Sequence, residues 1–194
     1  MDQSCFPAPA AEPAEAPPSD GTPADVVLAV RDKARALYRS RRLMCSEAIL
    51  AAVNVAFAGG LTEGQAVALA SAMPAGLGGS GCLCGALGGA AVALGLTLGR
   101  APAPVGRRAV RQASARLHDR FKEVHGATCC RALTRQVKDD AKAHFAQCEA
   151  ITAWTAEAAA RMILELRPDL ARSLGCVRPS PRGWLDRLKR LIRP

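Results

Sequence analysis

Aromatic side chains are scarce in this chain of 194 residues: they make up 4% of the composition, although 49% of the residues are hydrophobic. β-Sandwiches and β-barrels rely on β-branched and aromatic residues, and the sequence contains no sustained apolar–polar alternation of period two. Alanine, leucine, valine and glycine must instead form the core, and these small side chains suit helices that approach closely. The composition therefore predicts an all-α fold, a compact bundle of five to six helices.

A hydrophobic run long enough to cross a bilayer is also missing. Residues 64–99 carry no charged side chain, but Pro74 and the glycines between Gly76 and Gly81 divide the stretch into two shorter pieces. A membrane-spanning helix needs about 20 consecutive apolar residues. We therefore expect two buried helices that flank a loop. The N-terminal region is acidic and proline-rich, without the basic and apolar segments of a secretory signal, so we expect a cytoplasmic protein.

The motifs of the common enzyme classes are absent as well. The sequence has no P-loop, no HExxH helix, no nucleophile elbow and no GxGxxG after a strand. The glycine run 76–81 lacks the lysine and the preceding strand of a phosphate-binding loop. With these motifs absent, the cysteines are the candidates for the chemically active residues of the chain.

The net charge of +9 is concentrated in residues 107–140 and 161–194. Basic surfaces attract nucleic acid, anionic lipid or acidic proteins. Aromatic residues do not interleave the bases, so we expect no specific nucleic-acid binding. In the last segment, Trp184 and Leu188 fall on one side of a short helix and Lys189 and Arg190 on the other. Such a helix can bind an anionic membrane surface or an acidic partner, or it can pack on its own domain or on the second subunit of a homodimer.

Three regions follow from composition and helix signals. Residues 1–21 have the proline-rich, acidic character of a disordered tail, 22–168 form a helical domain, and 169–194 form a linker and the basic helix. Within the domain, Thr22 is a candidate N-cap followed by Pro23 at the first helical position. The helices are expected near 23–41, 45–58, 62–72, 84–98, 107–124 and 139–166, and the first should bury Val26, Val30, Ala34 and Leu37.

Eight cysteines are too many to ignore in a chain of this size: Cys5, Cys45, Cys82, Cys84, Cys129, Cys130, Cys148 and Cys176. Their spacing is not that of a zinc finger, because there is a CxC pair and a CC pair but no CxxC pair. In a reducing compartment, such cysteines favour metal binding or redox chemistry over a static disulfide framework.

The glycine-rich stretch 74–89 delivers Cys82 and Cys84 to the start of an apolar helix, where the helix dipole lowers a thiol pKa and favours the thiolate. Cys45 also opens a helix, Cys130 follows a glycine-containing turn, and Cys148 lies on the inward face of the long helix. Because a helical bundle can unite residues that are distant in sequence, we expect Cys45, Cys84, Cys130 and Cys148 to converge.

Four stretches carry a resemblance to a known family: Leu43–Leu50 around the first cysteine, Cys84–Gly89 with its Cys-Gly-Ala-x-x-Gly spacing, Phe121–Arg131 around the cysteine pair, and finally Cys148. In this order the chain resembles the redox-active protein family named C_GCAxxG_C_C. Either Cys82 or Cys84 can fill the second cysteine position of the pattern, and either Cys129 or Cys130 the third. We favour Cys84, because the alanine and glycine spacing follows it, and Cys130, because Arg131 is next to it.

The resemblance implies a small helical redox or metal-binding protein. Our first expectation is an iron–sulfur cluster held by Cys45, Cys84, Cys130 and Cys148 that transfers electrons. A second is metal-free thiol–disulfide exchange, with Cys82 and Cys84 as candidate redox thiols. A third is a structural zinc site, for which Cys82, Cys129 and His144 are further candidate ligands, in a protein whose role is interaction. Buried cysteines that act only as small hydrophobic residues are the remaining alternative.

Overall fold

The structure, a computed structural model, describes residues 22–99 and 105–173. Every regular element in these ranges is a helix, which confirms the all-α prediction. The helices are α1 (Pro23–Arg39), α2 (Cys45–Ala56), α3 (Glu63–Ala70), α4 (Pro74–Leu77), α5 (Gly85–Leu98), α6 (Arg107–His125), α7 (Cys130–Leu133), α8 (Ala141–Leu166) and α9 (Pro168–Ser173). The predicted count of five to six was too low, because α4, α7 and α9 are helices of six residues or fewer that carry no periodic pattern.

Two of the three expected regions fall largely outside the described residues. The tail 1–21 lies there, together with the basic segment Trp184–Arg193 and the cysteines Cys5 and Cys176. Residues 169–173, which we expected to belong to the linker, are helical in α9, and Leu170 packs against the core.

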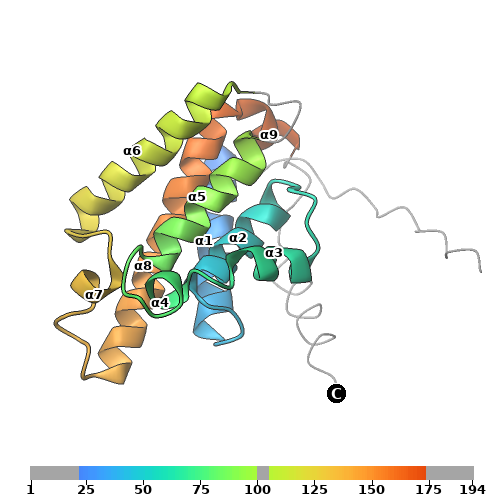
Figure 1. The fold of residues 1–194 in the computed structure, drawn as a ribbon. Coiled ribbons are helices and arrows are strands. Elements are labelled where there is room, and N and C mark those ends of the chain that lie inside the picture. Colours follow the sequence, from blue (N-terminus) through green and yellow to red (C-terminus); the bar gives the residue numbers. More distant parts are fainter. Residues whose placement is uncertain (1–21, 100–104, 174–194) are drawn as a thin grey trace, which may run out of the picture.

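The centre of the bundle consists of α1, α2, α5 and α8, which pack against one another, while α6 lies along the outer side of α5 and α8 (Figure 1). At one end of the bundle, α4 and α7 lie side by side near the start of α5. Helix α8 contacts α1, α2, α5, α6 and α9 and is the longest element. The helices α2, α5 and α7 begin at the end that carries α4 and α7, and the described cysteines gather there.

Close approach between α2 and α5 depends on glycine. A Cβ added at Gly89 would lie 2.6 Å from the Cα of Ser46, and one added at Gly85 would lie 2.7 Å from the Sγ of Cys45. No side chain larger than hydrogen fits at these two points, so the glycine spacing in α5 sets how near the two helices pack. This contact brings the start of α5 directly against the start of α2.

The packing face of α1 differs from the predicted one by a partial rotation. The helix buries Val27, Val30, Ala34 and Tyr38, whereas Val26 and Leu37 are only half-buried. Tyr38 turns inward because its ring stacks on Phe145 of α8, with 5.1 Å between the ring centroids. The stripe in the sequence could not reveal this partner, since it lies more than 100 positions away.

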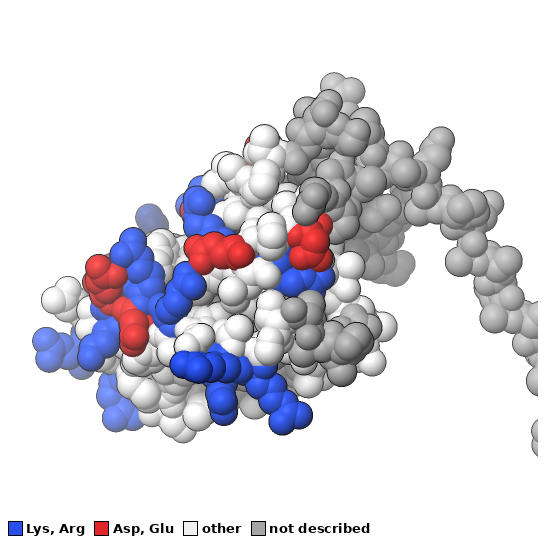
Figure 2. All heavy atoms as spheres, turned by 90° about the horizontal axis from the view of Figure 1, so that it is seen from above, with Lys and Arg blue, Asp and Glu red and all other residues white. Residues whose placement is uncertain are grey.

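Charges on the surface are mostly interspersed. Figure 2 shows basic and acidic groups next to each other on one side of the end seen from above, and a cluster of basic groups at its lower edge. Glu149, which is 7% exposed, accepts a hydrogen bond of 2.6 Å from Arg35 and lies 3.4 Å from Arg39. Within residues 22–99 and 105–173, no helix combines the length and hydrophobicity that crossing a bilayer requires.

A candidate redox site of two cysteine pairs

The candidate site lies where α2, α5 and α7 begin. Cys45 is the first residue of α2, Cys84 is the N-cap of α5, and Cys129 and Cys130 are the N-cap and first residue of α7. Local signals fix these starts: the carboxylate of Glu47 accepts a 2.7 Å hydrogen bond from the backbone N–H of Met44, one residue before α2. The positive ends of the α2 and α5 dipoles therefore face the same group of sulfur atoms.

The glycine loop is fastened to the segment before α7 by its backbone. The N–H of Cys84 donates to the carbonyl of Thr128 at 2.8 Å, and the N–H of Arg131 donates to the carbonyl of Gly81 at 3.0 Å. These two bonds enclose Cys82 on one segment and Cys129 and Cys130 on the other. Because each enclosed segment is only four residues long, Cys82, Cys84, Cys129 and Cys130 are held in one small region.

The loop can adopt this path because of two glycines with positive φ. At Gly76 (φ +73°) an added Cβ would lie 2.4 Å from the backbone nitrogen of Cys82. At Gly81 (φ +86°) it would lie 3.0 Å from Nε of Arg131, whose Nη2 donates to the carbonyl of Ser80 at 2.8 Å. Only glycine combines this backbone conformation with such close approach. Arg131 therefore braces the loop from the other segment.

Cys82 and Cys129 form a disulfide that joins the two segments. Cys82 is exposed and Cys129 is half-buried, so the bond is accessible from the surface. Cys45, Cys84, Cys130 and Cys148 are free thiols, and Cys84 is the most buried of them at 5% exposed. Among the sequence candidates, the structure thus separates an outer, oxidised pair from an inner, reduced group.

The inner pair shares a hydrogen bond and one proton. The Cys84 thiol donates to the sulfur of Cys130. This bond is the largest cause that lowers the pKa of Cys130; burial opposes it, the backbone amides of Gly85 and Cys130 add to it, and the net pKa is about 6. The same hydrogen bond, together with burial, raises the pKa of Cys84. At neutral pH the pair is therefore a Cys130 thiolate held by a Cys84 thiol.

Cys45 and Cys148 complete the inner group as neutral thiols. Burial raises the pKa of Cys45 to about 12, and a Cys130 thiolate nearby adds to the effect. Burial likewise raises the pKa of Cys148, again with a contribution from Cys130. Cys130 contributes to the raised pKa of both Cys45 and Cys148 and shares a hydrogen bond with Cys84, so the four free thiols lie near enough to influence one another.

Tyr38 is a site residue that the sequence analysis missed. Its hydroxyl donates a hydrogen bond to the Cys148 sulfur, which opposes the rise in the pKa of Cys148, while burial raises the pKa of Tyr38 itself. Its ring is held by Phe145, over which the guanidinium of Arg41 lies at 4.6 Å. The one available signal was that Tyr38 is the only tyrosine of the chain and falls near the apolar stripe of α1.

The predicted metal ligands find less support than the predicted convergence. In the described part of the chain, no group of three or more histidine, cysteine, aspartate or glutamate side chains has an arrangement that could hold a metal ion. The donor set of four free cysteines has the right chemistry for a zinc ion or an iron–sulfur cluster, but its arrangement does not fit a metal-ion site. His144 is half-buried on α8, one turn before Cys148.

Comparison with known proteins gives one match. No curated protein and no solved structure matches the chain. The family model described as "Putative redox-active protein (C_GCAxxG_C_C)" matches residues 43–162. That range contains the disulfide, all four free thiols of the site and the glycines of α5, and it covers more than half of the sequence. The chain therefore belongs to the C_GCAxxG_C_C family.

Proposed function

We propose that this protein is a thiol-based redox protein that exchanges two electrons between the outer disulfide Cys82–Cys129 and the inner pair Cys84–Cys130. One observation supports this most strongly: the two pairs lie on the same two backbone segments, one as a disulfide and the other as a hydrogen-bonded thiol and thiolate. A thiolate is the form that attacks a disulfide, and Cys130 has it at neutral pH.

The exchange balances without another reactant. The Cys130 thiolate attacks the Sγ of Cys82, the Cys82–Cys129 bond breaks, and Cys129 leaves as a thiolate. The proton of Cys84 passes to this leaving thiolate, and Cys84 then attacks the Sγ of Cys130, which releases Cys82 as a thiolate. The inner pair is oxidised to a disulfide and the outer pair is reduced to one thiol and one thiolate, a transfer of two electrons.

Attack on Cys82 rather than Cys129 follows from chain geometry. Adjacent Cα atoms are about 3.8 Å apart, which is shorter than disulfides usually span, so a bond between neighbours such as Cys129 and Cys130 is disfavoured. Cys45 and Cys148 do not compete as nucleophiles at neutral pH, because their pKa values are raised. The exchange is reversible, so the outer disulfide forms again when the outer pair reduces an oxidised inner pair. Small thiols of the cytoplasm, the compartment predicted from the sequence, would then reduce the outer disulfide.

An iron–sulfur cluster is the second candidate function, and its support is the donor set. Cys45, Cys84, Cys130 and Cys148 are four free thiols from α2, α5, α7 and α8 that gather at one place, and four sulfur ligands are what such a cluster needs. The arrangement of the described residues does not by itself form a metal-ion site, so we assign no step to a cluster.

The trapping of an intermediate tests the exchange. In Cys84→Ser the attack of Cys84 on Cys130 cannot occur. A disulfide between Cys82 and Cys130 should therefore accumulate when the reduced protein is oxidised mildly. Peptide mapping under non-reducing conditions should find Cys82 joined to Cys130 in this variant, and Cys84 joined to Cys130 in a fraction of the unaltered protein. Cys176→Ser is the control and should give the unaltered pattern. Failure to find Cys130 in any disulfide would overturn the proposal.

Metal analysis separates the two candidates. Protein purified without oxygen should be colourless, without stoichiometric iron or sulfide, if thiol exchange is its chemistry. A brown protein with iron that is retained in Cys5→Ser and Cys176→Ser but lost in Cys84→Ser would instead establish the cluster.

A further inference from the structure

A hollow of about 740 Å³ opens on the surface beside the outer disulfide. Cys82 and Cys129 form part of its wall, with Ser80 and Gly81 of the loop, Arg131 and Arg135 after the disulfide, and Gln147 of α8. A volume of this size suits a small molecule. A molecule bound in it would lie directly against the one disulfide that the structure exposes among the described residues.

The lining of this hollow is positively charged. It contains Arg131 and Arg135 but no aspartate or glutamate, and burial lowers the pKa of His125, which favours its neutral form. Neither arginine forms an ion pair with a described residue, and Arg131 is held in place by its 2.8 Å hydrogen bond to the carbonyl of Ser80. The guanidinium groups therefore remain available to an anion.

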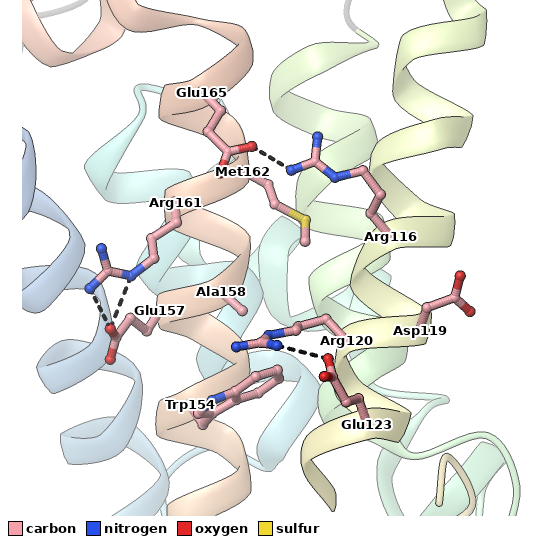
Figure 3. A pocket seen from close by; sticks show the side chains of 10 residues that line it. All are labelled: Arg116, Asp119, Arg120, Glu123, Trp154, Glu157, Ala158, Arg161, Met162 and Glu165. Atoms are coloured by element: carbon pink, nitrogen blue, oxygen red, sulfur yellow. Dashed lines mark hydrogen bonds and ion pairs between the residues drawn. The ribbon is translucent and has the colours of Figure 1, made fainter.

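A second hollow, of about 800 Å³ between α6 and α8, shows the contrast (Figure 3). Its three arginines point toward acidic partners within the same lining: Arg116 pairs with Glu165, Arg120 with Glu123 and Arg161 with Glu157. Those arginine charges are already paired with neighbouring carboxylates, so this hollow has no unpaired guanidinium group for an anionic ligand. Unlike the arginines between α6 and α8, the arginines beside the disulfide have no acidic partner in their own hollow, which indicates that this hollow can bind an anion.

We infer that the hollow beside Cys82–Cys129 binds a small thiol that carries a carboxylate, and that this thiol is the reductant of the outer disulfide; this inference rests on the proposed thiol–disulfide function. The carboxylate binds the guanidinium groups of Arg131 and Arg135, and this places the thiolate of the reductant at the exposed Cys82. The sulfur attacks Cys82 Sγ, and Cys129 leaves as a thiolate. A second molecule of the thiol then attacks the bound one, so that two thiols become one disulfide and the outer pair is fully reduced.

Stopped-flow reduction of the disulfide by matched small thiols tests the inference. We compare anionic 3-mercaptopropionate, neutral 2-mercaptoethanol and cationic cysteamine, and express each rate per concentration of its own thiolate. In the unaltered protein the order should be 3-mercaptopropionate, then 2-mercaptoethanol, then cysteamine. In Arg135→Gln the rate with 3-mercaptopropionate should fall by about fivefold while the rate with 2-mercaptoethanol is unchanged, the size expected for one charge-assisted contact at a surface.

Two further variants complete the design. Arg131→Gln should lower the preference in the same way, but it also loosens the loop, so Arg135→Gln, whose side chain has no hydrogen bond or ion pair with a described residue, decides the question. Arg120→Gln, from the hollow whose charges are paired, should leave every rate unaltered.

The outcomes separate this inference from the proposed function. Equal reduction by all three thiols, with no effect of Arg135→Gln, would overturn the anionic reductant and leave thiol exchange standing. The same result is expected if the physiological reductant is an acidic protein that contacts a wider surface. A disulfide that none of the three thiols reduces would overturn both proposals, since the outer pair would then be static.

Discussion

The hydrogen bond between Cys84 and Cys130 gives the sharpest test of the site, through the variant Cys84→Ala. The Cys84 thiol is the first cause of the low pKa of Cys130, about 6 against an ordinary value of 9.0. Removal of the donor should raise the pKa of Cys130. The backbone amides of Gly85 and Cys130 still lower this pKa and burial still raises it, so a return to the ordinary value of 9.0 serves as the measure of the change.

The size of the effect depends on pH, because two consequences oppose each other. With a pKa of 9.0, the thiolate fraction of Cys130 at pH 7 falls from about 0.9 to about 0.01. A thiolate of higher pKa is, however, intrinsically more nucleophilic, by roughly 20-fold for a shift of three units. The alkylation rate of Cys130 should therefore fall only about fourfold at pH 7 but rise by roughly 20-fold at pH 10, where Cys130 is about 90% or more ionised in both proteins.

The assay is the pH profile of iodoacetamide alkylation at Cys130, measured by mass spectrometry without reduction of the Cys82–Cys129 disulfide. In the unaltered protein the rate should rise to a plateau with a midpoint near pH 6, and in Cys84→Ala the midpoint should move up by more than one unit. The control Cys148→Ala removes a neighbouring thiol that does not donate to Cys130, so its midpoint should stay near pH 6. Superimposable profiles of Cys84→Ala and the unaltered protein would refute the assignment.

Two further predictions concern the supports of the site. In Gly89→Ala the new methyl group meets the backbone of Ser46, so the free energy of unfolding should fall by about 1–3 kcal/mol. Gly95→Ala, at a helical position with open space around it, should instead raise the free energy of unfolding by about 1 kcal/mol. Thermal denaturation measures both changes, and equal effects would contradict the close α2–α5 contact. In Tyr38→Phe the loss of the hydroxyl donor should raise the pKa of Cys148 and slow its alkylation at pH 8 by about fivefold, without a change in the midpoint of Cys130. An unaltered rate at Cys148 would mean that Tyr38 serves only in packing.

The helix starts could be predicted from the sequence because capping is local. Thr22 accepts a hydrogen bond from the backbone of Asp25, and Thr62 accepts one from the backbone of Gln65; in both cases the two residues are three positions apart, the spacing of a capping box. Cys45 and Cys84 likewise mark the starts of α2 and α5. Each signal depends on residues within one turn of each other, so no knowledge of the tertiary structure was needed.

Faces and partners were less predictable because distant residues decide them. In α6 the helical spacing of the apolar residues Leu117, Phe121 and Val124 predicts one inward face, but Val124 is 45% exposed, whereas Leu117 and Phe121 are buried. The inner face of an amphipathic helix is set by what its neighbours present, and the sequence pattern leaves a rotation of one residue open. The same limit hid Tyr38, whose role comes from Phe145 and Cys148 on α8.

The CxC and CC spacings do not match those of a zinc finger, and in the structure they correspond to cysteine pairs formed between two segments. Cys82 and Cys84, like Cys129 and Cys130, are too close in the chain to form a favourable disulfide with each other. Because their two segments lie side by side, each cysteine instead pairs with one from the other segment: Cys82 with Cys129, and Cys84 with Cys130. The bonds from Cys84 to Thr128 and from Arg131 to Gly81 hold the segments together when either pair is reduced. A transfer of two electrons between the pairs then needs only the exchange of sulfur partners, because the backbone that carries all four cysteines is fastened independently of them.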